Sequence, residues 1–246
     1  MNYTKTIGLI AGVGPYAGLD LQKKILDLID VPADQDYPTV IAYSGPASIP
    51  DRTRFLMGQT AENPAEGILA QLFVLEQAGV AVAGIPCNTA HAPAIFDQIK
   101  LGLLKKGSQL ILLNMIECVA EHLRQARPES QRVGLLATIG TYHSQVYHDL
   151  LRPAGFEVVV PAEPGQQVVQ AAIQHPEYGI KRWGYATERV RADLLATIDS
   201  LKQQGAEAII LGCTELPLAL PETAVFDLPL IDPTLILAQA LLQAAA

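Results

Sequence analysis

Apolar residues in this chain form short runs that alternate with stretches of helical periodicity. The runs at residues 6–11, 80–85 and 208–211 are rich in Ile, Val, Leu and Ala and stop at Gly or Pro, which is typical of buried parallel strands. Apolar positions recur every three or four residues in 61–78 and 187–203, which predicts helices. This alternation predicts an α/β fold of parallel sheets flanked by helices, with right-handed crossovers.

The two halves of the chain repeat one another at an offset of 126 residues. Residues 7–16 lie over residues 133–142, and the same offset carries Cys87 onto Cys213. A duplication predicts two pseudo-symmetric halves whose equivalent points face each other across one cleft. Parallel sheets bind ligands beyond the carboxyl ends of their strands, where both cysteines fall, so we expect the active site in that cleft.

Composition narrows the class of partner. The net charge is −8, which argues against nucleic acid or an anionic membrane surface as the main partner. The N-terminus lacks the pattern of a secretory signal, and no apolar stretch is long enough to span a bilayer. Three cysteines, an odd number, then indicate free thiols in a cytoplasmic protein rather than a disulfide framework.

Cys87 and Cys213 are the strongest candidates for chemistry. Each follows a buried strand and precedes a predicted helix, whose N-terminus favours the thiolate. Both could instead be small buried hydrophobes, as most free cysteines are. Their repetition at one point of a duplicated unit favours two acid–base groups on opposite sides of one ligand. Cys118 has no such partner, because Ala244 holds the equivalent place, and we assign it to packing.

Two further motifs have competing interpretations. Residues 12–17 match the loose dinucleotide pattern G-x-G-x-x-A, but Pro15 removes an amide that would cradle a phosphate. We favour a turn whose backbone N–H groups, at Val13 and Gly14, bind a carboxylate. His91 follows Cys87 at a spacing that could ligate zinc with Cys213, yet acid–base support or a structural role fits better. We therefore predict no metal and no cofactor.

Four basic residues lie in predicted loops of the two halves. Arg52 and Arg54 fall in one half, and Lys181 and Arg182 in the other. Solvated surface charge is the ordinary role of such side chains. A substrate with two carboxylates nevertheless needs cations, and Arg grips a carboxylate with two hydrogen bonds. Lys181 lies close to the position equivalent to Arg52 in the repeat, which makes these two the candidates.

The segments 86–91 (Pro-Cys-Asn-Thr-Ala-His) and 211–216 (Leu-Gly-Cys-Thr-Glu-Leu) resemble the aspartate/glutamate racemase family, whose members use no pyridoxal phosphate. The opening Gly-Leu-Ile-Ala-Gly-Val-Gly-Pro and the segments 50–53 and 179–181 follow in the family's order, so the resemblance covers nearly the whole chain. Glu215 looks like the aspartate and broad-specificity branch, because glutamate racemases usually have His there.

The resemblance implies racemisation of an acidic amino acid, aspartate before glutamate, by a two-base mechanism. Cys87 and Cys213 would flank the substrate Cα, and Arg52 and Lys181 would hold its side-chain carboxylate. The α-carboxylate and ammonium groups would be held by Asn88, Thr89, Thr138, Thr141 and Thr214. His91 and Glu215 would assist proton balance at the two thiols.

The same resemblance also implies the organisation of the chain and leaves other activities open. A homodimer is expected, with one domain at residues 1–115 plus 225–246 and a second at 116–224, so that the last strand and helix return to the first half. A cysteine-dependent isomerase or decarboxylase of small dicarboxylates is an alternative, marked by a covalent adduct on Cys87. A non-catalytic amino-acid-binding protein is another.

Overall fold

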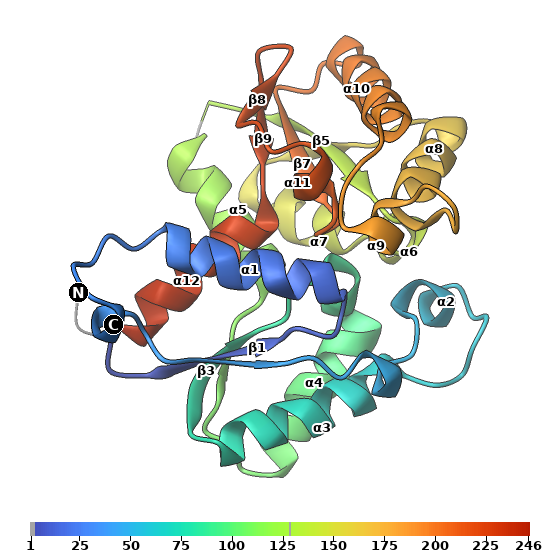
Figure 1. Ribbon diagram of the computed structural model, residues 1–246. Helices are drawn as coiled ribbons and strands as arrows, with labels where there is room; N and C mark the ends of the chain where they lie inside the picture. The colour runs from blue at the N-terminus through green and yellow to red at the C-terminus, as the bar shows by residue number, and fades with distance from the viewer. Residues whose placement is uncertain (1–2, 128) are drawn as a thin grey trace.

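Two sheets form the framework of the protein (Figure 1). The computed structural model describes residues 3–127 and 129–246 of the chain. The first sheet has the order β2-β1-β3-β4 and is parallel throughout, and its strands span Val40–Tyr43, Thr6–Ile10, Val80–Gly84 and Ile111–Leu112. The second has the order β6-β5-β7-β9-β8, and its strands span Glu157–Val159, Arg132–Ala137, Ala208–Gly212, Leu228–Ile231 and Ala224–Val225.

The strand order confirms the predicted α/β fold of two pseudo-symmetric halves. β1 and β5 each begin their half, and each lies between the following strand and the strand that precedes a cysteine segment. Within the second sheet only the pairing of β8 with β9, among the described residues, is antiparallel. β5 and β7 are almost wholly buried, as their continuous apolar runs predict.

Helices cover both faces of the first sheet. α1 and α12 pack against each other on one side of β1 and β3, and α3 and α4 lie on the other (Figure 1). The helices of this half are α1 (Pro15–Asp27), α2 (Arg52–Leu56), α3 (Pro64–Gln77), α4 (Pro93–Lys105) and α12 (Pro233–Ala245), with 3-10 turns η1 (Asp34–Asp36), η2 (Pro46–Ser48) and η3 (Asn88–His91). Several begin with Pro at the first turn, where a missing N–H breaks no hydrogen bond.

The second half contains both long helices and several of only one or two turns. Its helices are α5 (Met115–Ala126), α6 (Ile139–Ser144), α7 (Val146–Leu151), α8 (Glu163–Gln174), α9 (Ile180–Trp183), α10 (Glu188–Gln203) and α11 (Leu216–Ala219), with the 3-10 turn η4 (Arg152–Ala154). Gln145 adopts a left-handed backbone with φ 56° and separates α6 from α7. Lys181 and Arg182, which we expected in a loop, lie on the four-residue helix α9.

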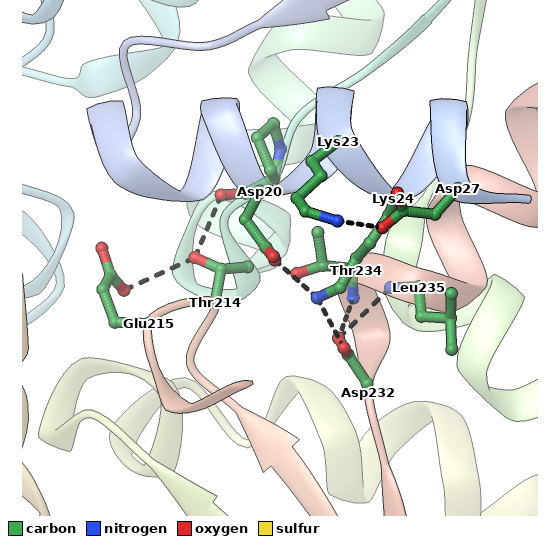
Figure 2. Close-up of polar contacts among 10 residues, drawn as sticks. Asp20, Lys23, Lys24, Asp27, Thr214, Glu215, Asp232, Thr234 and Leu235 are labelled. Atoms are coloured by element: carbon green, nitrogen blue, oxygen red, sulfur yellow. Dashed lines mark hydrogen bonds and ion pairs between the residues drawn. The ribbon is translucent and has the colours of Figure 1, made fainter. Parts of the chain in front are cut away.

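The C-terminal segment returns to the first half as a helix but not as a strand. α12 packs on α1 and β3, whereas β9 (residues 228–231), which we also expected in the first domain, pairs with β7 in the second sheet. The chain crosses over at Asp232, whose carboxylate caps α12 by accepting from the N–H groups of Thr234 (2.9 Å) and Leu235 (3.2 Å). Lys24 of α1 bridges Asp232 (2.6 Å) and Asp20 (2.5 Å), which ties this cap to α1 (Figure 2).

One buried core continues through both halves and holds their relative position. It joins Leu9 and Leu21 of the first half to Tyr147 and Ile210 of the second, with Leu237 of α12 between them. A second core fills the space between β5, β7, α8 and α10, and a third lies under α3 and α4. Within the described residues, none of the helices combines the length and apolar character needed to cross a membrane.

Candidate active site

An enclosed cavity lies where the carboxyl ends of the two sheets meet. Its lining comes from both halves: Asp51, Arg52, Thr53, Cys87, Asn88 and Thr89 from the first, and Thr138, Gln174, Lys181, Cys213, Thr214 and Glu215 from the second. Its free volume is about 10 Å³, room for about one water molecule. The structure is therefore closed, and an amino acid needs the cleft to open or side chains to move.

A second cavity of about 200 Å³ adjoins the first and shares Arg52, Lys181 and Glu215 with it. Gly12, Gly14, Pro15, Tyr16 and Pro46 complete its lining. Gly14 has φ 113°, and a Cβ built on it would lie 2.8 Å from Glu215 Oε1. The glycine turn therefore reaches across the cleft to the ionised groups of the second half. Val13 is fully buried in the core of the first half and lines neither cavity.

The two thiols hold equivalent places but enter the cavity differently. Cys213 directly follows β7, whereas Ile85 and Pro86 separate Cys87 from β3, and Cys87 is the N-cap of η3. Both cysteines are free, with 8% of Cys87 and 7% of Cys213 exposed. The structure thus brings the duplicated cysteines, both almost fully buried, to one narrow cavity.

Cys213 belongs to a chain of polar contacts within the second half. Its Sγ donates a hydrogen bond to Glu215 Oε2 at 2.9 Å, and Glu215 Oε1 pairs with the ammonium of Lys181. Burial, together with the Glu215 charge, raises the pKa of Cys213 well above its usual value. Burial acts to raise the pKa of Glu215, but Lys181, the Cys213 hydrogen bond and the Arg52 charge together outweigh it, and the net direction is down. The resting state is therefore a Cys213 thiol beside a Glu215 carboxylate.

Arg52 is a cation of the first half that interacts electrostatically with the other thiol. It begins α2, which Asp51 caps by accepting from the Arg54 N–H at 2.8 Å. Burial acts to lower the Arg52 pKa, the charge of Cys87 acts to raise it, and the net direction is up. The guanidinium also lines both cavities. Each half therefore contributes one thiol and one cation to the site.

Hydroxyl and amide groups join the two halves beside the thiols. Thr89 Oγ1 lies 3.0 Å from Thr141 Oγ1 and 3.2 Å from Thr138 Oγ1. Thr214 donates across the cleft to the Pro86 carbonyl at 3.2 Å, and its contact with Glu215 is drawn in Figure 2. Four of the predicted binding residues therefore lie together at the seam between the halves.

Asn88 has one satisfied and one free polar atom. Its Oδ1 accepts from the hydroxyl of Tyr147 at 2.5 Å, while its buried Nδ2 has no hydrogen-bond partner among the described residues. A buried unpaired donor is unfavourable until a ligand accepts from it. Asn88 therefore presents an N–H₂ group that suits a carboxylate oxygen.

His91 contacts the backbone of the Cys87 segment rather than its thiol. Its Nδ1 lies 2.9 Å from the Cys87 carbonyl, and its ring stacks on Phe96 with centroids 4.8 Å apart. Burial lowers its pKa to about 4, so the ring is neutral at physiological pH. This geometry suits a residue that fixes the backbone of η3.

Sequence reasoning missed several residues of the site. Asp51 and Thr53 stand in the segment that carries Arg52, so the resemblance contained a signal for both. Gln174 lines the cavity from the end of α8 without any motif around it. Tyr147 reaches Asn88 from α7, and its repeat position holds Leu21, so the duplication gave no hint of it.

Comparisons with known proteins agree with this arrangement. The family model described as Asp/Glu/Hydantoin racemase matches residues 10–241. The broad specificity amino-acid racemase RacX of Bacillus subtilis is 27% identical over 242 residues, which cover 95% of either chain. The aspartate racemase of Picrophilus torridus superposes with a TM-score of 0.82 at 29% identity, covering 98% of this chain and 94% of that one. An aspartate racemase homologue from Pyrococcus horikoshii gives 0.74 at 25% identity, covering 98% and 99%.

Proposed function

Because this chain belongs to the Asp/Glu/hydantoin racemase family and is an amino acid racemase, we propose that its substrate is an acidic amino acid, aspartate before glutamate. Cys87 and Cys213 act as the two bases, and no cofactor takes part. The observation that carries the proposal is the placement of two buried thiols, one from each half, on one closed cavity. We further propose a cytoplasmic homodimer, on the family resemblance.

The two thiols exchange one proton each with the substrate. One thiolate removes the proton from Cα, which forms its S–H bond and leaves a carbanion. The other thiol gives its proton to the opposite face of that carbon and becomes the thiolate. The configuration inverts, and the enzyme ends with the proton on the other sulfur, ready for the reverse reaction.

The difficulty of this chemistry is the weak acidity of Cα–H. Closure around about one water molecule supports a desolvated thiolate, which is a stronger base than one in water. As the proton leaves, negative charge develops on the α-carboxylate oxygens. The free Nδ2 of Asn88 and the hydroxyl of Thr89 are placed to donate to such a group, which would stabilise the transition state.

The cations support a substrate with a second carboxylate. Arg52 and Lys181 come from opposite halves and both line the cavity and its extension. Two cations facing one ligand match an acidic side chain and fit a neutral or basic one poorly. The similarity to an aspartate racemase supports aspartate as the first choice.

A heavy-water incubation tests the proposal. Reduced protein is mixed with L-aspartate, and separately with L-glutamate, without added cofactor, and Cα–H loss and the two enantiomers are followed by proton NMR and chiral chromatography. We expect deuterated D-aspartate to form faster than deuterated D-glutamate.

The double variant Cys87→Ala/Cys213→Ala and the single variant Cys118→Ala are the matched controls. The first removes both thiols of the cavity and should form no D-product, whereas the second removes a thiol remote from it and should behave as the wild type. Failure of the wild type to exchange either amino acid, or activity in the double variant, would overturn the proposal. Faster exchange of neutral amino acids than of acidic ones would overturn its substrate.

A further inference from the structure

We propose that Lys181 and Glu215 form a substrate-operated switch for the Cys213 thiol. The side-chain carboxylate of the substrate draws Lys181 away from Glu215, and Glu215 then takes the proton of Cys213. This inference rests on the proposed function, since it requires an acidic substrate, and it explains how a buried thiol becomes a base only when substrate is present.

The contacts of Glu215 make its two partners compete. One carboxylate oxygen accepts from Cys213 Sγ and the other pairs with Lys181 Nζ. While the ammonium stays, the carboxylate is held ionised and the proton remains on sulfur, in keeping with the raised pKa of Cys213 and the lowered pKa of Glu215. A change at Lys181 therefore reaches Cys213 in two ways: through Glu215, and directly, since the ammonium charge acts to lower the Cys213 pKa.

Lys181 is the member of the pair that can move. Glu215 is 1% exposed, whereas 29% of the Lys181 side chain is exposed. Lys181 lies on the one-turn helix α9 and lines the 200 Å³ cavity that extends the closed site. A ligand carboxylate in that cavity can reach the ammonium, while Glu215, which also lines the cavity, stays almost fully buried.

Loss of the ammonium leaves Glu215 without an equivalent partner. The charged or ionisable groups that face Glu215 among the described residues are Lys181, Arg52 and Cys213. Arg52 lines the same cavity and would also turn toward the ligand carboxylate. A buried carboxylate that has lost its cation and lies near the ligand carboxylate favours its protonated form.

The proton balance closes over one turnover. The S–H bond of Cys213 breaks and an O–H bond forms on Glu215 Oε2, which leaves a thiolate with no net proton uptake. The thiolate takes the Cα proton, and Cys87 gives its own proton to the product. When the product leaves, Lys181 returns, Glu215 releases its stored proton, and Cys87 regains one through solvent.

The first test removes the ammonium of Lys181 by mutation and is carried out in the absence of substrate. In the Cys87→Ala/Cys118→Ala background, alkylation of Cys213 by iodoacetamide is followed by mass spectrometry for Lys181→Met and for the matched control Arg182→Met, which removes the neighbouring cation of α9. The switch predicts alkylation faster by about tenfold in Lys181→Met, because the proton moves to Glu215. A cation that merely favoured the thiolate would give the opposite sign, so slower or unchanged alkylation overturns the proposal.

The second test removes the proton store. For Glu215→Gln we expect kcat to fall about 100-fold at pH 7 while KM stays within about threefold of the wild-type value. Above pH 7 the kcat of this variant should rise about tenfold for each pH unit, because Cys213 must now lose its proton to solvent. A pH profile like that of the wild type would sink the proposal. A merely structural role would change KM or stability without this dependence on pH.

The third test needs no turnover, so it reports on the switch even if racemisation itself is not observed. Succinate, a dicarboxylate without an amino group, should produce the ultraviolet difference absorbance of a thiolate in the wild type, whereas butyrate, with one carboxylate, should not. Cys213→Ala and Glu215→Gln should lack the band. A band that persists in either variant, or no band in the wild type, contradicts the switch.

Discussion

The surroundings of Cys87 and Cys213 differ more than their sequence repeat suggests. Cys213 donates to a carboxylate that is held ionised by Lys181, whereas Cys87 interacts electrostatically with Arg52 and has no carboxylate bonded to it among the described residues. The duplication thus supplies two thiols at equivalent points, but the charged groups around Cys213 differ from those around Cys87. In the two-base mechanism that we propose, the two thiols would therefore receive and lose protons by different routes.

Single replacement of the thiols has the largest expected effect on this comparison. Cys87→Ala and Cys213→Ala should each lose racemisation by about 10³-fold or more, because each lacks either the base or the acid. Each should still exchange the Cα–H of one enantiomer in heavy water through the remaining thiol. The enantiomers should be opposite in the two variants, which chiral chromatography and proton NMR distinguish. Exchange of the same enantiomer by both would contradict a two-sided site.

Arg52→Met tests the cation of the first half. The lost bidentate contact with the substrate carboxylate should lower kcat/KM about 100-fold, chiefly through KM. Arg54→Met is the matched control, because Arg54 lies on the same helix α2 with an exposed side chain, and its kinetics should equal those of the wild type. Equal effects of the two replacements on kcat/KM would mean that Arg52 does not bind the substrate.

The architecture and the paired thiols could be predicted from the sequence because repetition leaves a local signature. Strand runs, glycine turns and the offset that joins Cys87 to Cys213 are visible in single segments. The sheet to which residues 228–231 belong could not be predicted, since a short apolar strand can pair with either sheet and only tertiary packing decides between them. The break at Gln145 was also hidden, because Gln rarely adopts a positive φ and tertiary contacts impose it.

Asymmetry at the site was harder to predict than the thiols themselves. Glu215 was placed by resemblance, but its simultaneous contacts with Cys213 and Lys181 depend on how α9 lies over the end of β7. The contact of Tyr147 with Asn88 joins residues 59 positions apart in the sequence. Such pairs have no signal in a single chain, because neither residue type is unusual in its own segment.

His91, which holds the backbone of the Cys87 segment, should make the stability of the protein depend on pH. Its folded-state pKa of about 4 lies below the value of 6.5 that an exposed histidine has, so the unfolded chain binds the proton first. Between pH 6.5 and 4 this should remove about 3 kcal/mol from the free energy of unfolding. His91→Gln should lack that loss. Urea unfolding at pH 7 and pH 4.5 measures the difference between the two proteins.

Phe96→Leu separates this titration from packing. It replaces the ring that stacks on His91 with a smaller aliphatic side chain but keeps the imidazole. Its free energy of unfolding should be lower than that of the wild type by a similar amount at both pH values. If His91→Gln loses as much stability between pH 7 and 4.5 as the wild type does, His91 is not the buried neutral group that we describe.

Gly14→Ala tests how closely the first half approaches the ion pair of the second. Its Cβ would meet Glu215 Oε1 at 2.8 Å, on a backbone with φ 113°. We expect kcat/KM to fall about tenfold and stability to fall by about 2 kcal/mol. Gly58→Ala is the control, because Gly58 also has a positive φ, 69°, but open space around it. It should lose about 1 kcal/mol of stability and no activity.

Cys118 supplies the baseline against which both cavity thiols are compared, and its replacement should have the smallest effect. Cys118→Ser should leave racemisation within about twofold, because the residue lies on α5, outside the lining of the site. Burial, with the nearby Glu117 charge, raises its pKa to about 11. In the Cys87→Ala/Cys213→Ala background, its alkylation by iodoacetamide should therefore rise about tenfold per pH unit between pH 8 and 10. A rate that levels off near pH 9 would instead indicate an ordinary thiol pKa, and burial would then not be what raises the pKa of Cys118.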